Sequence, residues 1–344
     1  MSDHNPRLGV VVLAAGEGTR MRSALPKVLH AICGRPLLGH VLAIAEALEP
    51  AAIVVVLAPD TVEQVRASFG DRYGYAVQAE RRGTGHAVLQ ARAALAQQAD
   101  EVLVLYGDTP LLRAATAQEV VRLRRARGAL VGLLSFYAHP PTGYGRVLRD
   151  AAGQVIGLIE ERNATPEQRA ISEGNSGIMC FDAAWLWQAI ERLQPNPPKG
   201  EYYLTDLVEL AVAERGPGAA VALVATDACE AWGINDRTQL AAAAAALRQR
   251  ILEELMRAGV TIVDPATTYV DVGVVVGHDT TLLPGTMLCG ATRVGAGCLI
   301  GPSTTLNNAV IGDGAHVRYA VIERTEIPAN ATNGPFAYIT GADP

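Results

Sequence analysis

Aliphatic residues recur at every sixth position over a long stretch of the C-terminal third of the sequence. A period of six fits neither an α-helix, which repeats every 3.6 residues, nor a strand, which repeats every two. It fits a β-solenoid whose coils have three short faces, with one inward-pointing aliphatic side chain on each face. Glycine directly follows several of these positions. The pattern therefore predicts a solenoid, built on Val270, Val276, Leu282, Leu288, Val294, Ile300 and Leu306.

The repeat slips in phase near Ile311 and partly resumes at Val317. At about 18 residues per coil, residues 259–344 have room for roughly three to four coils. The pattern resembles the left-handed parallel β-helix of hexapeptide-repeat proteins. A short solenoid exposes open edges and apolar faces. Because relatives pack three such β-helices together, the resemblance implies a homotrimer formed through this part of the chain.

Up to about residue 226 the sequence alternates between apolar runs and amphipathic stretches. Continuously apolar runs suit strands that are buried on both faces of a mainly parallel sheet. Four runs read as strands, at residues 10–13, 53–57, 101–105 and 130–136, and three of them are continuously apolar. Two apolar stripes between them predict helices, one with Leu38, Val41, Ala45 and Leu48, the other with Val62, Val65 and Phe69. The alternation predicts an α/β domain with a doubly wound, mixed but mainly parallel sheet.

An alanine-rich stretch at residues 238–258 separates the two patterns. Alanine is the best helix former, and the spacing of Leu247, Ile251 and Leu255 favours a helix over disordered low complexity. We therefore expect an α/β domain at residues 1–237, a connecting helix at 238–258 and a shortened β-helix at 259–344.

Charge and cysteine content exclude several classes of protein. The formal net charge of −6 leaves no overall basic surface for nucleic acid or an anionic membrane. No apolar stretch approaches the roughly 20 residues of a membrane span, and no secretory signal is visible. The five cysteines share no CxxC spacing, which indicates reduced thiols and a cytoplasmic location. The histidines, His30, His40 and His86 among them, show no metal-binding spacing, and no chemistry is assigned to them.

The first apolar run ends in a glycine-containing basic loop within GVVVLAAGEGTRMRSALPKVL, residues 9–29. In open α/β sheets, ligands bind beyond the carboxyl ends of the strands. Gly16 and Gly18 allow close approach of the backbone to an anion, and Arg20 and Lys27 add positive charge. A dinucleotide fingerprint fails because position 21 is Met21, and a Walker motif is absent. The loop is either another kind of phosphate-binding loop or a plain turn with solvated charges.

These residues carry a family resemblance. LAAGEGTRM followed by LPKVL resembles the signature of sugar-1-phosphate nucleotidyltransferases, and more specifically that of the bacterial bifunctional N-acetylglucosamine-1-phosphate uridyltransferase/glucosamine-1-phosphate acetyltransferases. The resemblance continues in order along nearly all of the chain. Its further segments are QAERRGTGHA (78–87), LYGDTPLL (105–112), GYGRV (143–147), GLIEERNAT (157–165), GNSGIM (174–179), GEYYLTD (200–206), WGIND (232–236) and GVTIVDPATTYVD (259–271).

The resemblance implies a nucleotide-diphospho-sugar transferase type of α/β domain and a defined reaction. N-acetylglucosamine 1-phosphate would attack the α-phosphorus of UTP in line, giving pyrophosphate and UDP-N-acetylglucosamine for cell-envelope precursors. Such a site works mainly by holding two polyanions together and offsetting their repulsion. The substrates would be small molecules, and the cofactor would be Mg²⁺.

The metal and phosphate residues follow from the same resemblance. Asp108 ends an apolar run and would hold Mg²⁺ together with Asn235, since Mg²⁺ usually keeps several waters and phosphate oxygens. The alternatives are a helix N-cap for Asp108, before Pro110, and a turn residue for Asn235. Arg20 would neutralise the triphosphate and Lys27 would lie nearer to the reacting phosphates.

The remaining site residues divide between nucleotide and sugar. The loop residues Leu13, Ala14, Ala15, Gly16 and Gly18 would contact the nucleotide, and Gln78, Gly83 and Thr84 would contact its uracil. A side-chain amide with backbone groups can pair with both donor and acceptor atoms of a pyrimidine. Residues that map onto the sugar pocket are Tyr106, Gly107, Gly145, Glu160, Asn175 and Asn235. For Glu160 the alternative is a solvated surface carboxylate.

The sequence departs from the resemblance at two places. Glu17 puts an acidic residue between the loop glycines, where it could weaken triphosphate binding or point to water. The segment resembling GPFARLRPG reads GPFAYITGADP, so that Tyr338 and Thr340 replace the expected arginines. We therefore expect acetyltransferase activity to be absent.

Three other functions are compatible with parts of the pattern. The chain could use another sugar 1-phosphate or another nucleotide. It could be a non-catalytic hexapeptide-repeat binding protein, although Arg20, Lys27, Asp108 and Asn235 are all retained. An acyltransferase acting through the solenoid is disfavoured by the short repeat.

Overall fold

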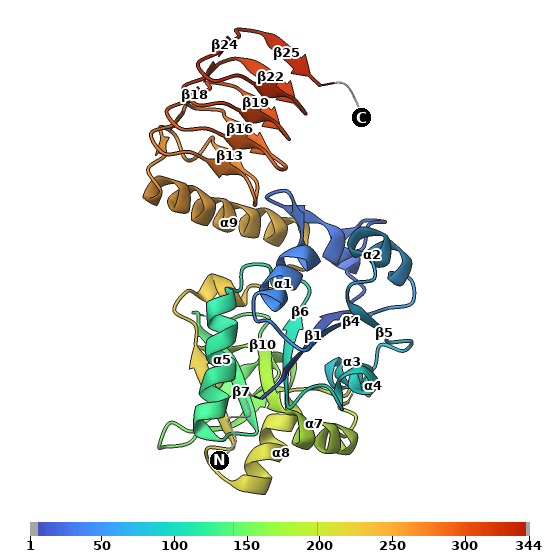
Figure 1. The fold of residues 1–344 in the computed structure, drawn as a ribbon. Coiled ribbons are helices and arrows are strands. Elements are labelled where there is room, and N and C mark those ends of the chain that lie inside the picture. Colours follow the sequence, from blue (N-terminus) through green and yellow to red (C-terminus); the bar gives the residue numbers. More distant parts are fainter. Residues whose placement is uncertain (1–5, 140, 198, 342–344) are drawn as a thin grey trace. The chain divides into compact units, whose positions relative to one another are not determined.

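The computed structural model describes residues 6–139, 141–197 and 199–341. These residues form two compact units (Figure 1). The first contains residues up to 30 and residues 36–239, and the second contains residues 31–35 and the residues from 240 onward.

The first unit is built on a mixed sheet, which has nine strands among the described residues and the order β11-β7-β10-β6-β1-β4-β5, with β8 paired to β10 and β9 paired to β8. The pairs β11–β7, β6–β1, β1–β4 and β4–β5 are parallel, whereas β10 runs antiparallel to both of its neighbours. The strands are β1 (Leu8–Ala14), β4 (Ala52–Leu57), β5 (Gly74–Val77), β6 (Glu101–Tyr106), β7 (Val131–Tyr137), β8 (Arg146–Arg149), β9 (Val155–Ile159), β10 (Glu173–Asp182) and β11 (Ala220–Val224).

Helices cover both faces of this sheet because successive strand residues point to opposite sides. In β1, Val10 and Val12 pack in one apolar cluster, and Val11 and Leu13 pack in the other. Both clusters are buried, so the strands read as continuous apolar runs. The helices are α1 (Leu37–Glu46), α2 (Val62–Phe69), α3 (Thr84–Leu89), α4 (Arg92–Leu95), α5 (Ala114–Arg127), α6 (Pro166–Arg169), α7 (Ala183–Ala189) and α8 (Asp206–Arg215), with 3-10 turns η1 (Thr19–Met21), η2 (Lys27–Leu29), η3 (Glu161–Asn163), η4 (Ile190–Arg192) and η5 (Ala228–Ala231).

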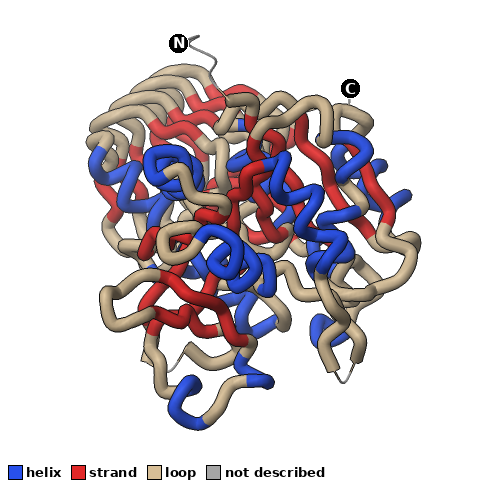
Figure 2. Tube along the Cα trace, turned by 90° about the horizontal axis from the view of Figure 1, so that it is seen from below, coloured by secondary structure: helices blue, strands red, loops and turns tan. Residues whose placement is uncertain are grey.

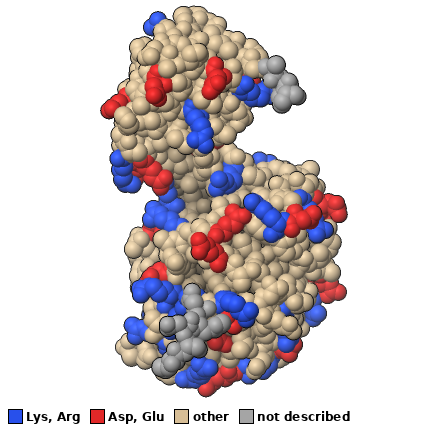
Figure 3. All heavy atoms as spheres, in the orientation of Figure 1, with Lys and Arg blue, Asp and Glu red and all other residues tan. Residues whose placement is uncertain are grey.

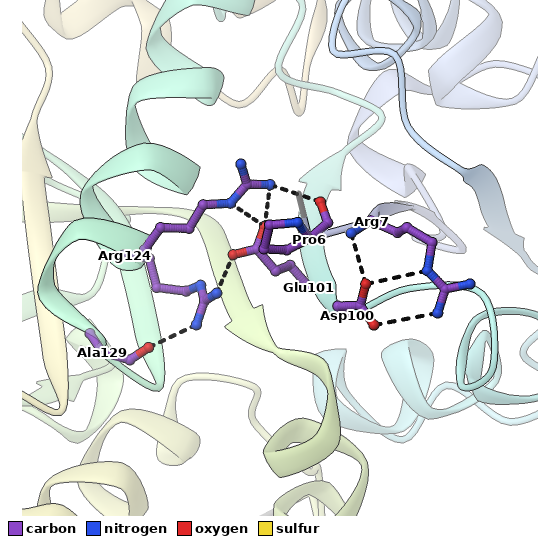
Figure 4. A network of polar contacts seen from close by, with 7 residues as sticks. Pro6, Arg7, Asp100, Glu101, Arg124 and Ala129 are labelled. Atoms are coloured by element: carbon purple, nitrogen blue, oxygen red, sulfur yellow. Dashed lines mark hydrogen bonds and ion pairs between the residues drawn. The ribbon is translucent and has the colours of Figure 1, made fainter. Parts of the chain in front are cut away.

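A polar network fixes the start of β6 (Figure 4). Glu101 is buried and accepts hydrogen bonds from Arg124 and, at 2.6 Å, from Arg125 Nε on α5. Arg124 also donates to the carbonyl oxygen of Ala129 at 2.8 Å. Asp100 accepts from the backbone N–H of Arg7 at 2.9 Å. A buried carboxylate is tolerated here because both of its oxygens are paired.

The second unit contains a three-faced solenoid of short parallel strands (Figure 2). It also contains the part of α9 (Arg237–Arg257) that begins at residue 240. The inward positions Val270, Val276, Leu282, Leu288 and Val294 are all buried. The described strands form sheets of five, five and four members. These sheets are β12 (Thr261–Ile262), β15 (Thr281–Leu282), β18 (Leu299–Ile300), β21 (His316–Val317) and β24 (Thr332–Asn333); β13 (Tyr269–Val270), β16 (Met287–Cys289), β19 (Thr305–Asn307), β22 (Ala320–Glu323) and β25 (Ala337–Thr340); and β14 (Val275–Val276), β17 (Arg293–Val294), β20 (Val310–Ile311) and β23 (Glu326–Ile327). The pair β2 (Ala31–Ile32) and β3 (Arg35–Pro36) forms a separate two-stranded sheet.

The predicted fold class is confirmed: a mixed, mainly parallel α/β sheet is followed by a left-handed parallel β-helix. The expected number of coils, three to four, was too low, because two of the three faces carry five described strands. The coils after Leu306 are shorter than 18 residues, as the pairing of Val310 with Glu326 shows, so the repeat continues beyond the point where its six-residue phase breaks. Leu48 lies beyond the end of α1, at Glu46, and is only partly buried.

Within the described residues, no helix is both long enough and apolar enough to cross a bilayer.

Candidate functional site

A cavity of about 960 Å³ opens in the first unit at the carboxyl ends of β1 and β6. This is where ligands bind in open α/β sheets. Of the seventeen residues expected in the site, thirteen line the cavity. They are Leu13, Ala14, Ala15, Gly16, Lys27, Gln78, Gly83, Thr84, Tyr106, Asp108, Gly145, Glu160 and Asn175.

The loop after β1 leaves open space for a ligand at one glycine and is closely packed at the next. A Cβ added at Gly16 would have no atom of the protein within 4 Å, and the residue is exposed. Gly18 has a φ of +63°, and a Cβ there would lie 2.7 Å from Lys27 Cβ. Gly18 therefore permits the left-handed turn into η1 and makes room for the Lys27 side chain.

Lys27 connects the two expected metal ligands. It opens η2, and its ammonium group donates to the carboxylate of Asp108 and, at 3.4 Å, to Asn235 Oδ1. The Lys27 and Asp108 side chains are 11% and 18% exposed, so the ion pair is largely shielded from water. The backbone also joins these segments, because the N–H of Ile234 donates to the carbonyl oxygen of Asp108 at 3.0 Å.

The N-cap alternative for Asp108 is wrong. The next helix, α5, begins at Ala114, and its N-cap residue is Arg113, without a capping side chain. Asp108 instead directs its carboxylate toward Lys27 and the cavity.

The oxygens of Asp108 and Asn235 suit a hard cation. Both groups already converge on the Lys27 ammonium, and carboxylate and amide oxygens are ligands that Mg²⁺ accepts. In the described part of the chain, no three His, Cys, Asp or Glu side chains gather as a metal cluster. Any cation held here would therefore have few protein ligands, which Mg²⁺ tolerates because it keeps waters and substrate oxygens.

Gln78, Gly83 and Thr84 form one wall of the cavity. Gln78 follows β5 and is buried, and its Nε2 donates to the Gly83 carbonyl oxygen at 3.0 Å. Thr84 is the first residue of α3, and its Oγ1 accepts from the N–H of Leu204 at 3.0 Å. The wall is thus fixed by contacts both within the segment and to residue 204.

Glu160, Tyr106 and Asn175 lie on the remaining cavity wall. Burial raises the pKa of Glu160 above its ordinary value, although the Thr205 hydroxyl donates to its Oε1 at 3.2 Å. Burial also raises the pKa of Tyr106, and the nearby carboxylates of Glu160 and Asp108 raise it further. Asn175 is buried on β10, and its N–H donates to the Gly145 carbonyl oxygen at 2.8 Å. Glu160 is therefore no solvated surface carboxylate.

Four expected residues do not line the cavity: Gly18, Arg20, Gly107 and Asn235. Gly18 and Asn235 contact Lys27, as described above. Gly107 directly follows β6, and its N–H donates to the Leu13 carbonyl oxygen at 2.9 Å. Arg20 is exposed on η1 and has no ion-pair partner among the residues that the structure describes.

The structure adds cavity residues that sequence reasoning missed. Arg81 donates to the Ala15 carbonyl oxygen at 3.1 Å and approaches the Glu17 carboxylate at 3.4 Å. Glu17 thus faces a guanidinium group and does not stand as an uncompensated negative charge. Arg162 lies over the ring of Tyr203 and binds Glu201 at 2.6 Å. All four of these residues lie in segments that carry the family resemblance: Arg81 in QAERRGTGHA, Arg162 in GLIEERNAT, and Glu201 and Tyr203 in GEYYLTD. Their place in those segments was the signal that could have identified them as cavity residues.

Basic and acidic side chains occur together both on the outer surface and in the cavity. On the face shown in Figure 3, basic and acidic side chains are interspersed. Four basic residues line the cavity: Lys27, Arg81, Arg162 and Arg169. Four carboxylates line the same cavity, those of Asp108, Glu160, Glu161 and Glu201. The cations therefore offer local partners to an anionic ligand without giving the cavity an excess of positive charge.

Comparisons with known proteins agree with this architecture. The MobA-like NTP transferase domain family matches residues 10–172. The bifunctional protein GlmU of Thermobifida fusca is 50% identical over 325 residues, which cover 92% of this chain and 66% of that protein. The bifunctional protein GlmU of Pelotomaculum thermopropionicum is 46% identical over 334 residues, or 96% of this chain and 72% of that protein. That of Corynebacterium efficiens is 44% identical over 345 residues, or 98% and 71%.

The chain thus spans between 66% and 72% of the length of these three relatives. Because nearly all of it is matched at this level of identity, the chain belongs to the family of the bifunctional protein GlmU and is a nucleotidyltransferase.

Proposed function

We propose that this enzyme joins UTP and N-acetylglucosamine 1-phosphate to give UDP-N-acetylglucosamine and pyrophosphate. A phosphate oxygen of the sugar forms a bond to the α-phosphorus of UTP, and the bond from that phosphorus to the bridging oxygen breaks. Pyrophosphate leaves with the electron pair. The proposal rests on the family and on a cavity lined by cationic side chains, by the Asp108 carboxylate and by groups that can bind hydroxyls.

The chain's own residues have separate tasks in this reaction. The open loop at Gly16 accepts the triphosphate against backbone N–H groups, and Lys27 offsets charge at the reacting phosphates. Gln78 and Gly83 bind the base, and Glu160 and Asn175 bind the sugar. Mg²⁺, held by Asp108 and Asn235, would neutralise phosphate charge. Exposed Arg20 would close on the triphosphate from outside the cavity wall.

The observation that carries the proposal is the convergence of Lys27, Asp108 and Asn235 beside the cavity. It is tested by pyrophosphate release from UTP, Mg²⁺ and N-acetylglucosamine 1-phosphate, with glucose 1-phosphate in a parallel reaction. We expect the acetylated sugar to react fastest. Asp108→Asn keeps the size of the side chain but removes its charge, and we expect it to lower kcat by about 100-fold or more.

Two results would contradict the proposal. Faster release with glucose 1-phosphate would assign the site to another sugar. No release above background from folded protein that still binds UTP would leave a nucleotide-binding protein without this activity.

We propose in addition that three copies associate through the solenoid. On the face formed by β13, β16, β19, β22 and β25, outward side chains align in register: Tyr269, Met287, Thr305, Val321 and Tyr338. Four of these are apolar or aromatic and at least one third exposed. Light scattering on the purified chain tests this, and we expect a trimer that Met287→Glu dissociates.

For acetyl transfer we propose that these 344 residues are inactive, since Tyr338 and Thr340 stand where the resemblance implies arginines. Incubation with acetyl-CoA and glucosamine 1-phosphate should release no free CoA above background. Release of CoA at a rate that depends on both substrates would contradict this.

A further inference from the structure

Both hydrogens of the Gln78 side-chain amide have an acceptor within reach in the protein. Gln78 Nε2 donates to the Gly83 carbonyl oxygen at 3.0 Å and lies 3.1 Å from His86 Nδ1. The side chain is 4% exposed, and its backbone N–H donates to the Leu57 carbonyl oxygen at 2.8 Å. The amide is therefore enclosed by protein, and its partners distinguish its nitrogen from its oxygen.

This arrangement leaves the Gln78 carbonyl oxygen as the group available to a ligand. No described residue donates a hydrogen bond to Oε1, and Gln78 lines the cavity. The carbonyl oxygen of an amide can accept hydrogen bonds but cannot donate them. It suits a base that presents an N–H, as uracil does at N3, and it opposes cytosine, which presents a lone pair there.

The ring of His86 can hold this orientation only when it is neutral. To accept from Gln78, Nδ1 must carry no proton, so the ring hydrogen lies on Nε2. Burial lowers the pKa of His86 and the Arg82 guanidinium lowers it further, while the Glu80 carboxylate and backbone oxygen raise it. The net direction is downward and favours the neutral ring. Gln90 Nε2 lies 3.3 Å from His86 Nε2, so in this tautomer two donors face each other there. The Gln90 amide has an acceptor of its own, because it donates to the His86 carbonyl oxygen at 2.9 Å, and it does not need the ring nitrogen.

We propose that His86 is a positioning residue that locks the Gln78 amide with its oxygen toward the ligand, and so makes the site prefer uridine over cytidine nucleotides. This inference rests on the proposed function, since it concerns the base of the same nucleotide.

Gly83 alone holds the amide less firmly. Its carbonyl oxygen also accepts from the Ala87 N–H at 3.1 Å, so it keeps a partner if the amide turns over. Without an acceptor at His86, the present orientation would leave one buried amide hydrogen unpaired, which costs free energy. The reversed orientation would present an NH₂ group to the base, which suits the cytosine lone pair, although it would also place Oε1 against the Gly83 carbonyl oxygen. His86→Leu therefore removes the preference that His86 adds and leaves the weaker one that comes from Gly83.

The test compares UTP and CTP in pyrophosphate release and in equilibrium binding by calorimetry. His86→Leu removes the acceptor, and His86→Asn restores one close to the position of Nδ1. We expect His86→Leu to lower the UTP/CTP ratio of kcat/KM by about 10-fold or more, mainly through the KM for UTP. His86→Asn should keep the ratio within about threefold of the wild type. Gln90→Leu, which alters the other edge of the ring, should leave it unchanged.

A second measurement needs no variant. Protonation of His86 places a hydrogen on Nδ1, where it opposes the Gln78 NH₂ group. The UTP/CTP ratio of the wild type should therefore fall as the pH is lowered through the His86 pKa, which lies below the ordinary 6.5. The nucleotide phosphates titrate alike in UTP and CTP, so their effect cancels in the ratio. Cytosine N3 gains a proton in stronger acid, so the comparison is confined to pH values at which free CTP keeps an unprotonated base.

An unchanged ratio in His86→Leu, or equal loss in His86→Leu and His86→Asn, would overturn the proposal. Failure of the proposed function would look different. A wild type that releases no pyrophosphate but binds UTP more tightly than CTP, with the preference lost in His86→Leu, would contradict the reaction and support the lock.

Discussion

The ammonium group of Lys27 donates a hydrogen bond to the carboxylate of Asp108, although 81 residues separate them in the sequence. The same ammonium reaches Asn235 Oδ1, which lies 208 residues from Lys27 along the chain. One cation thus joins the loop after β1, the end of β6 and the segment before α9. The first two segments meet because parallel β1 and β6 are neighbours in the sheet and end at the same edge. The third is joined to them by the Ile234 N–H, which donates to the Asp108 carbonyl oxygen.

Lys27 offers a clean test of this arrangement, because the chain has only two lysines, Lys27 and the exposed Lys199. Lys27→Ala should lower kcat by about 100- to 1000-fold, because it removes a positive charge from the reacting phosphates. Lys199→Ala is the matched control and should retain wild-type kinetics. Steady-state pyrophosphate release measures both. Equal activity of the two variants would contradict a role for Lys27 at the phosphates.

The two loop glycines should respond differently to the same substitution. Gly18→Ala forces a side chain into a left-handed conformation and against Lys27 Cβ, so it should cost about 1–2 kcal/mol of stability and lower kcat. Gly16→Ala meets no atom in the protein, so stability should be unchanged while the KM for UTP rises. Thermal unfolding and UTP titration separate the two effects. A normal KM in Gly16→Ala would mean that the nucleotide does not approach this backbone.

The strands of the first unit were predictable from the sequence because burial on both faces leaves a continuous apolar run. Residues 10–13, 53–57 and 101–105 became β1, β4 and β6 for this reason. The antiparallel β10 was not anticipated as a strand, because Gly174, Asn175 and Ser176 interrupt its apolar pattern. They coincide with an irregularity in its pairing with β7. Local sequence carries no signal for the direction in which such a strand joins the sheet.

The site was predictable in part for a similar reason. Gly16 and Lys27 lie in one continuous segment with a recognisable composition, whereas Asn235 lies 208 residues from Lys27 and was identified only through resemblance. The contact between Gln78 and His86 depends on the turn into α3 at Gly83. No spacing rule indicates it, so His86 was passed over.

A buried carboxylate of the first unit should make its stability depend on pH. Burial raises the pKa of Glu173, but hydrogen bonds from Arg149 and Ser135 outweigh this effect and lower it below the ordinary 4.5. The stabilisation is therefore present above pH 4.5 and is lost as the pH falls through the lower, folded-state pKa. Glu173→Gln should cost about 1–3 kcal/mol near neutral pH, and the difference from wild type should shrink in acid.

Chemical denaturation at several pH values checks this prediction. Glu119→Gln is a suitable control because it alters an ion pair with Arg122 that is open to solvent, and it should have little effect on stability. A difference between wild type and Glu173→Gln that stays constant from neutral to acid pH would show that the charge of Glu173 is not responsible.

Two adjacent valines test the orientation of the solenoid strands. In β14, Val275 is 48% exposed and Val276 is 8% exposed, so the same side chain points outward at one position and inward at the next. Val276 lies in register with Val294, and Val294 with Ile311, and all three pack in the solenoid core. Val276→Ala should destabilise the second unit by about 1.5–3 kcal/mol, because it removes buried apolar surface and leaves a cavity. Val275→Ala makes the same chemical change at an exposed site and should alter the midpoint of thermal unfolding little. Equal losses in the two variants would mean that the outward position is also buried, and light scattering on Val275→Ala would then show whether contact between copies buries it.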